Sequence, residues 1–370
     1  MALPAGSAVW AKMADGEYME AKAEAEAGVV LLGAAGDGER KMIAAADVLP
    51  ANPGPAVPDL TTLVVLNEAT MLHNVRERYM KSKIYTRAAN MLVAVNPGHA
   101  IPELYTEAVR GKSKGNDLRD PRLEPHLYDV AEQAYRQLSA ELKPQSIVIS
   151  GESGAGKTES IKYCMNYLVW RSSTAAKSKP GDSESATQLT TRIMQSNPLL
   201  EALGNAKTQR NHNSSRFGKY ITLQFDEAYA IVGAQIHTFL LEKSRVTNAD
   251  ASNERSYHVL YQLVAGSPLM AGKACEDFRM LSLSGTTAVP GKDDSTEFKN
   301  LQVALGWFGI EPAVQEGLWQ VRLCSRCLPM PSDALRCLLV PSDALRCPLM
   351  PPRAPVTGAR RRTAPGQRRL

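Results

Sequence analysis

Residues 151–158, with the sequence GESGAGKT, limit the folds open to this chain more than any other segment. They fit the spacing Gly-x-x-x-x-Gly-Lys-Thr, in which glycines let successive backbone N–H groups converge on phosphate oxygens. Such a loop follows a β-strand and opens a helix, whose positive N-terminal end faces the same phosphates. The segment, called the phosphate loop below, therefore predicts an α/β fold that holds a nucleoside triphosphate.

Both flanks of the phosphate loop carry the required pattern. Residues 146–150 (SIVIS) predict a short buried strand, and apolar residues recur at helical spacing behind the loop. Lys157 is expected to reach the β- and γ-phosphates, and the Thr158 hydroxyl is a hard oxygen ligand suited to Mg²⁺. The apolar residues behind the loop are Ile161, Cys164, Met165, Leu168 and Val169.

A second polar segment, residues 211–219 (NHNSSRFGK), precedes an alternating run at 220–225. Its hydroxyls, amides and arginine are typical of a ligand-sensing loop that leads into a strand. Taken alone, a solvated turn rich in Asn and Ser explains the same residues equally well. Residues 211–217 are called the polar loop below.

Together with residues 204–208 (GNAKT), these two segments resemble the phosphate loop and first switch loop of a myosin motor head. A kinesin, which is mechanistically related, lacks the Arg-Phe-Gly-Lys ending. The resemblance continues in register over roughly residues 8–321, for example in LNE at 66–68, VNP at 95–97 and LLEKSRV at 240–246. Collinear similarity of this length is more specific than any single motif.

The resemblance implies a role for each matching residue. Asn211 would touch the phosphates, Ser214 would lie beside the attacking water, and Arg216 would pair with a glutamate of the second switch loop. Thr158 and Ser215 would be the protein ligands of Mg²⁺. The implied catalytic residues are Lys157, Ser214, Ser215 and Arg216. The implied ATP-binding residues are Gly151, Glu152, Ser153, Gly154, Ala155, Gly156, Lys157, Thr158 and Asn211, with Asn96 and Pro97 at the purine.

The second switch loop of the family, Asp-x-x-Gly-Phe-Glu, does not occur in the 370 residues. Arg216 is therefore expected to lack its family partner. In the family topology, the strand at 146–150 lies between two strands from later sequence, so it is expected to have two open edges. The chain is interpreted as the front portion of a motor, truncated before the second switch loop.

The predicted fold class is α/β, with a P-loop NTPase core at 58–321 whose mixed central sheet is flanked by helices. A small β-barrel at 8–50, with short strands near residues 9, 20, 30 and 42, precedes it, and a tail at 322–370 is predicted to be disordered. Within the core we expect a buried strand at 91–95, a hairpin of strands at 220–225 and 231–241, and a helix at 254–265. The stretch at 172–187 resembles the family's surface loop that tunes nucleotide exchange, and a plain flexible connector explains it equally well. His258 is interpreted as a packed, hydrogen-bonded histidine, and Glu254 and Arg255 as members of structural ion pairs.

The tail differs from the rest of the chain in composition. It repeats PSDALRC at 331–337 and 341–347. Its ten arginines and two aspartates give it a net charge of 10 − 2 = +8, which exceeds the +5 of the whole chain. Low-complexity sequence of this kind does not build a core. The Cys324-x-x-Cys327 pair lacks a second pair with zinc spacing. The cluster Arg360, Arg361 and Arg362 could bind nucleic acid, but a disordered tail without a nucleic-acid partner is the preferred interpretation.

No apolar run reaches the length of a membrane span, so a cytoplasmic protein is expected. The resemblance implies that it belongs to a myosin complex of the cytoskeleton. The resemblance implies actin filaments as partner and actin-activated Mg-ATPase as activity. Most of the actin-binding surface and the light-chain-binding lever lie in sequence that the chain lacks, so light chains are not expected. Three hypotheses follow: a motor that couples ATP hydrolysis to movement, a fragment that binds the nucleotide without turnover, and a truncated product that does not fold alone.

Overall fold

The computed structural model describes residues 4–24, 29–32, 38–115, 123–176, 183–246, 253–323 and 368–369. The chain divides into two compact units, Met1–Gln133 and Ala134–Leu370, each of which is described by itself. Residues 324–367 of the predicted disordered tail lie outside the described residues. The predicted boundaries of the domains remain predictions.

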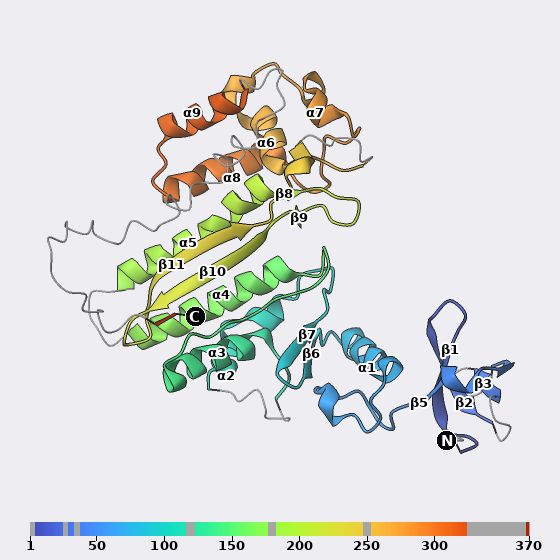
Figure 1. The fold of residues 1–370 in the computed structure, drawn as a ribbon. Helices are drawn as coiled ribbons and strands as arrows, with labels where there is room; N and C mark the ends of the chain where they lie inside the picture. The colour runs from blue at the N-terminus through green and yellow to red at the C-terminus, as the bar shows by residue number, and fades with distance from the viewer. Residues whose placement is uncertain are drawn as a thin grey trace. The chain divides into compact units, whose positions relative to one another are not determined.

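The first unit begins with an antiparallel sheet of five strands in the order β4-β3-β2-β1-β5 (Figure 1). Alternate side chains of the central strands, among them Val9, Ala11 and Ala21, turn to one face and form a small apolar core. The strands predicted near residues 9, 20, 30 and 42 are all present, and closure of this sheet into a barrel stays a prediction. The strands are β1 (Ala8–Lys12), β2 (Tyr18–Ala23), β3 (Val29–Leu32), β4 (Arg40–Met42) and β5 (Val48–Pro50).

A helix and a short hairpin complete the part of the first unit that bears on function. Helix α1 (Glu68–Met80) starts where the Asn67 side chain accepts a hydrogen bond from the Thr70 amide at 2.9 Å. Its buried Arg78 donates to the Tyr85 carbonyl at 2.8 Å and so ties the helix to β6 (Tyr85–Ala88), which pairs with β7 (Met91–Ala94). Helix α2 (Glu107–Ser113) follows, and α3 (Leu127–Glu141) begins in this unit.

Two long helices and a hairpin form the layer of the second unit that carries the phosphate loop. Helices α4 (Lys157–Ala176) and α5 (Ser183–Gly204) both contact β11 (Ile231–Phe239), which pairs with β10 (Gly218–Phe225) (Figure 1). The hairpin and the helix behind the phosphate loop were correctly predicted. The stretch predicted as flexible at 172–187 is instead helical at both ends, and its centre, 177–182, lies outside the described residues.

Two short pairings complete this layer. Strand β8 (Asn205–Ala206) pairs with β9 (Ser214–Ser215), and the terminal β12 (Arg368–Arg369) pairs with β10 at Gln224 and Phe225. Because β8 directly follows α5 in sequence, its pairing with β9 holds the polar loop next to the end of that helix.

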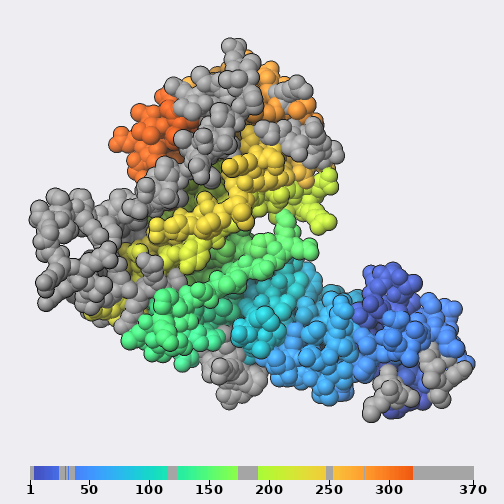
Figure 2. Space-filling model, in the orientation of Figure 1, coloured from blue at the N-terminus to red at the C-terminus, as the bar shows by residue number. Residues whose placement is uncertain are grey.

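A helical layer packs against the C-terminal part of α5, and Figure 2 shows it in orange above the yellow hairpin. Helices α6 and α8 approach closely, because a Cβ on Gly266 would lie 2.6 Å from Cβ of Phe298. Helix α6 begins at His258 rather than at the predicted residue 254. The layer consists of α6 (His258–Gly266), α7 (Arg279–Ser282), α8 (Asp294–Trp307) and α9 (Pro312–Leu323). Its core includes Leu199, Ala202, Val259, Leu263, Phe298, Leu301, Leu305 and Trp319.

The strand predicted immediately before the phosphate loop is wrong. Residues 144–150 form no strand, and the Val148 side chain is 87% exposed. A strand exists only through hydrogen bonds to neighbours, and no described residue pairs with this segment. Apolar, β-branched residues alone therefore do not make this segment a strand, and among the described residues it is an unpaired connection into the phosphate loop. The strand predicted at 91–95 is present as β7, but it is not buried, since Met91 is 65% exposed.

Among the helices that the structure describes, none is long and apolar enough to span a bilayer.

The exposure of Val148 can be tested with a matched pair of substitutions. Val148→Thr is expected to change the free energy of unfolding by less than about 0.5 kcal/mol, because the side chain already faces water. Val259→Thr places a hydroxyl in the buried face of α6 and is expected to cost about 1–3 kcal/mol. Urea unfolding followed by circular dichroism measures both. If Val148→Thr lowers the free energy of unfolding as much as Val259→Thr does, residues 146–150 form a buried strand after all.

Candidate functional site

The phosphate loop has the backbone conformation that an anion-binding loop needs. Gly154 and Gly156 have φ values of 87° and 93°, in the left-handed region that side chains with a Cβ rarely adopt. The Ala155 amide donates to the Glu152 carbonyl at 3.2 Å and tightens the turn, and helix α4 begins at Lys157. Backbone N–H groups of such a turn and of the helix N-terminus attract phosphate, so the loop fits a nucleotide phosphate chain.

Lys157 closes the phosphate loop on itself. Its Nζ donates to the carbonyl oxygens of Gly151 and Glu152 at 2.6 and 2.7 Å. A phosphate would offer the same ammonium a charged acceptor, which forms a stronger hydrogen bond than a carbonyl does. The lysine is therefore already at the loop, and nucleotide binding would exchange its acceptors.

The polar loop is held in shape by hydrogen bonds of its own. The Asn211 side-chain carbonyl accepts from the Asn213 amide at 2.9 Å, and the Asn211 amide donates to the Thr208 hydroxyl at 3.1 Å. Strand β9 pairs Ser214 with Ala206. This pairing leaves Ser214 buried and Ser215 exposed.

Ser214 joins the two loops. Its Oγ lies 2.9 Å from Oγ of Ser153 in the phosphate loop and accepts a hydrogen bond from Nη1 of Arg216 at 3.1 Å. The structure thus brings together Ser153, Ser214 and Arg216 from loops about sixty residues apart in sequence. Across the described residues, no hydrogen bond connects Thr158, Asn211 or Ser215 between the loops, so their shared role stays a prediction.

Arg216 lacks the second-switch partner that the resemblance implies, but it pairs with another acidic residue of the chain. Its Nε donates to Oε2 of Glu242 at 2.6 Å, and Nε of Arg245 donates to the same oxygen at 2.7 Å. Burial alone would raise the pKa of Glu242, but the hydrogen bonds from Arg245 and Arg216 outweigh it and lower that pKa. Glu242 of the LLEKSRV segment thus pairs with Arg216, for which the resemblance implied a glutamate of the second switch loop.

The ion pairs predicted around this group are confirmed. Arg245 Nη1 donates to Glu254 at 3.0 Å, and the buried Arg255 pairs with Asp294 at 3.0 Å.

Asn213 anchors the polar loop to two helices, α5 and α6, and to strand β8. Its Nδ2 donates to Oε2 of Glu201 at 3.0 Å, and its Oδ1 lies 3.0 Å from Nδ2 of Asn205 and 3.1 Å from Nε2 of His258. Glu201 also pairs with Lys162 of α4 at 3.1 Å. Sequence reasoning missed Asn213 and Glu201: Asn213 lies inside the polar motif and could have been singled out, whereas nothing local marks Glu201.

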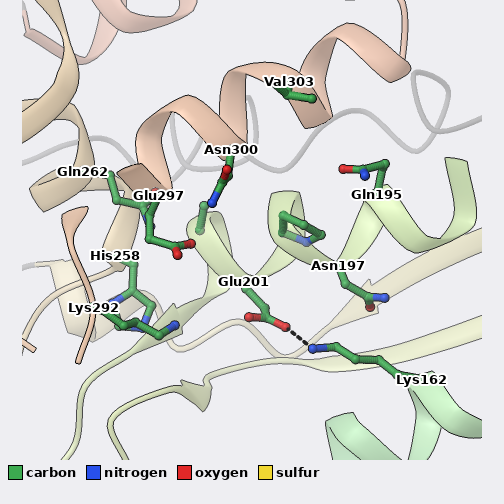
Figure 3. A pocket seen from close by; sticks show the side chains of 12 residues that line it. Lys162, Gln195, Asn197, Glu201, His258, Gln262, Lys292, Glu297, Asn300 and Val303 are labelled. Atoms are coloured by element: carbon green, nitrogen blue, oxygen red, sulfur yellow. Dashed lines mark ion pairs between the residues drawn. The ribbon is translucent and has the colours of Figure 1, made fainter. Parts of the chain in front are cut away.

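A cavity of about 320 Å³ opens beside this network, between α4, α5, α6 and α8 (Figure 3). Figure 3 shows Lys162 and Glu201 facing each other at one side of the cavity, with His258 and Lys292 at the other. Its lining also includes Gln195, Asn197, Pro198, Ala202, Gln262, Glu297, Asn300 and Val303.

The adenine contacts expected at Asn96 and Pro97 remain predictions. Both residues belong to the first unit, where Asn96 Oδ1 accepts from the Gly98 amide at 3.0 Å and the Pro97 carbonyl accepts from the Tyr79 hydroxyl at 3.3 Å. No group of three or more His, Cys, Asp or Glu in the described part of the chain could hold a metal ion. The predicted Mg²⁺ ligands are hydroxyls, which such a group does not include. Cys324 and Cys327 lie outside the described residues.

Comparisons with known proteins agree with these motifs. Residues 57–329 match the family model described as myosin head (motor domain). Human unconventional myosin-Vb is 42% identical over 269 residues, which cover 71% of this chain and 14% of that protein. Human unconventional myosin-Va is 40% identical over the same shares, and Myosin-2 of Saccharomyces uvarum is 41% identical over 72% of this chain and 17% of its own length. The chain thus spans about a seventh of the length of these relatives.

His258 is a packed histidine, as predicted, and its burial has a measurable consequence. Burial first, and then the charges of Arg255 and Lys292, lower the pKa of His258 from 6.5 to about 3. Below about pH 6.5 the imidazole of His258 is protonated in the unfolded chain but stays neutral in the folded chain. The contribution of His258 to the free energy of unfolding is therefore complete above that pH and is lost as the pH falls toward 3.

His258→Gln keeps a donor for Asn213 but removes the titration. Between pH 6 and 5, the free energy of unfolding of the parent chain should fall more steeply than that of the variant, by about 1.4 kcal/mol per pH unit. Urea unfolding at several pH values measures the difference. His212→Gln, at an exposed histidine of the polar loop, controls for the replacement of a histidine by glutamine. Equal slopes for parent and His258→Gln would contradict a neutral, buried His258.

Proposed function

Because the chain belongs to the myosin head family, we propose that its phosphate loop and polar loop together bind the triphosphate of Mg·ATP. The observation that carries this proposal is the 2.9 Å contact between Ser153 and Ser214, which brings the two predicted phosphate-binding segments to one place. The left-handed glycines and the position of Lys157 at the start of α4 support it. The family assignment made from the motifs is confirmed by the match over residues 57–329.

Each residue of the proposed site contributes through its own chemistry. Lys157 and the N–H groups of the loop would bind the β- and γ-phosphates, while Thr158 and Ser215 would hold Mg²⁺, which neutralises phosphate charge. Ser214, buried between Ser153 and Arg216, would position the attacking water, and Asn211 would contact the phosphates. In phosphoryl transfer, positioning and charge stabilisation of this kind supply most of the catalysis. Asn96 and Pro97 would border the purine.

The activity proposed for the whole protein is the family's: ATP hydrolysis that is stimulated by actin filaments and coupled to movement along them. An association with the cytoskeleton in the cytoplasm belongs to the same proposal. No nucleic-acid partner and no light chain are proposed for these residues.

A second candidate function is nucleotide binding without turnover, and the ion pair between Arg216 and Glu242 favours it. In that pair, Nε of Arg216 lies 2.6 Å from Oε2 of Glu242, a residue of the same chain. In the family pattern the same arginine pairs with a glutamate of the second switch loop, which does not occur in this sequence. Among the described residues, no strand pairs with the segment 144–150 that leads into the phosphate loop.

Lys157→Ala is expected to weaken binding of a fluorescent ATP analogue at least about tenfold in the presence of Mg²⁺, because a charge-assisted hydrogen bond is lost. A fluorescence titration of the full chain measures the dissociation constant. Lys299→Ala, at an exposed lysine of α8, is the control and should leave the affinity unchanged. Equal affinity of parent and Lys157→Ala would place the nucleotide elsewhere.

Turnover separates the two candidate functions. If Glu242 retains Arg216, the parent chain should bind Mg·ATP but release phosphate no faster in the presence of actin filaments than in their absence. A single-turnover assay with a phosphate-binding reporter measures the release. Phosphate release that rises with actin concentration would exclude the second candidate and establish the motor activity.

A further inference from the structure

We propose that Glu201 is a positioning residue, which fixes the polar loop against the phosphate loop by holding the side chain of Asn213. The proposal rests on the proposed function for its effect on nucleotide, but the contact itself exists without any ligand. Neither Glu201 nor Asn213 is among the residues that the motifs assigned to the site.

Glu201 bridges two elements with its two carboxylate oxygens. Oε1 pairs with Nζ of Lys162 at 3.1 Å, and Oε2 accepts from Nδ2 of Asn213 at 3.0 Å. Lys162 belongs to α4, the helix that begins at Lys157, and Asn213 directly precedes Ser214. One acidic side chain thus connects the helix behind the phosphate loop to the residue next to the contact between the two loops.

The charge of Glu201 also sets the orientation of the Asn213 amide. A carboxylate only accepts hydrogen bonds, so Nδ2 of Asn213 must face it and Oδ1 must face away. Oδ1 then meets the donors Nδ2 of Asn205 and Nε2 of His258 at 3.0 and 3.1 Å. A neutral His258 carries one ring proton, which this contact places on Nε2. Turning the amide over would set two donors against its NH₂ group and an oxygen against the carboxylate.

This arrangement predicts an unusual result for Glu201→Gln. The new amide has one oxygen and one NH₂ group, but both neighbours, Lys162 and Asn213, are donors. One contact must therefore become a donor facing a donor, and turning Asn213 over would set its NH₂ group against Nδ2 of Asn205 and Nε2 of His258. Removing Lys162 as well relieves the conflict, because the amide oxygen can then serve Asn213 alone. The double variant Lys162→Met/Glu201→Gln should accordingly bind better than Glu201→Gln.

Glu159 offers a matched control. Its Oε1 lies 2.9 Å from the same Lys162 nitrogen, but Glu159 is an exposed residue of α4 and has no hydrogen bond to the polar loop among the described residues. Glu159→Gln therefore removes an ion pair of Lys162 and leaves the Asn213 contact intact. A general loss of charge around Lys162 would affect both single variants alike.

Two measurements on the full chain decide the question. The first is hydrogen exchange of residues 211–217 in the nucleotide-free protein, which should become faster in Glu201→Gln and stay unchanged in Glu159→Gln. The second is titration with fluorescent analogues of ATP and ADP in the presence of Mg²⁺. Glu201→Gln should weaken binding of the ATP analogue roughly tenfold, and the double variant should regain affinity to within about threefold of the parent. The ADP analogue, which lacks the γ-phosphate, should be affected less.

Equal effects of Glu201→Gln and Glu159→Gln, or a double variant that exchanges and binds as poorly as Glu201→Gln, would overturn the positioning role. If the parent chain binds no Mg·ATP, the proposed function fails, and the exchange of residues 211–217 still tests Glu201. If Glu201→Gln does not fold, Asn213→Ala removes the same contact from the loop side. It should then show the faster exchange and weaker binding, and parent-like values would overturn the proposal.

Discussion

Helix α5 is the element on which the second unit depends, because its last turns serve two environments at once. Leu199 and Ala202 face the apolar core of α6, α8 and α9, while Glu201, in the last turn of the helix, and Asn205 of β8, directly after the helix, bond to the polar loop. Neighbouring residues of a helix project about 100° apart, so adjacent positions can serve both faces. Packing of the apolar face therefore determines where Glu201 and Asn205 can hold Asn213.

The polar loop is consequently anchored at both ends. Asn213 is held by Glu201, Asn205 and His258, and Arg216 is held by Glu242. Between these anchors, Ser214 is buried against Ser153 of the phosphate loop. Each anchor uses a charged acceptor or a buried histidine, for which leaving a partner unpaired is costly in a low-dielectric environment. These contacts within the chain define the shape of the polar loop.

Local pattern predicted well those elements whose stability is local. Helix α4 follows from apolar spacing behind a glycine loop, and the β10–β11 hairpin follows from two alternating runs around a short turn. The strand at 146–150 failed because a strand is defined by its neighbours: no described residue pairs with this segment, and Val148 is exposed. The partner of Arg216 was missed for a similar reason. Glu242 lies 26 residues along the chain, and only the return of β11 brings it to the loop.

The sequence by itself determined the family, the conformation of the phosphate loop and the residues available to bind a triphosphate, because glycines and the lysine act through the local backbone. Tertiary structure alone decided which side chains meet: Ser153 with Ser214, Glu242 with Arg216, and Glu201 with Asn213. These contacts join segments that are 12 to 61 residues apart. The packing of α5 and the pairing of short strands set such distances, and no local pattern in the chain specifies them.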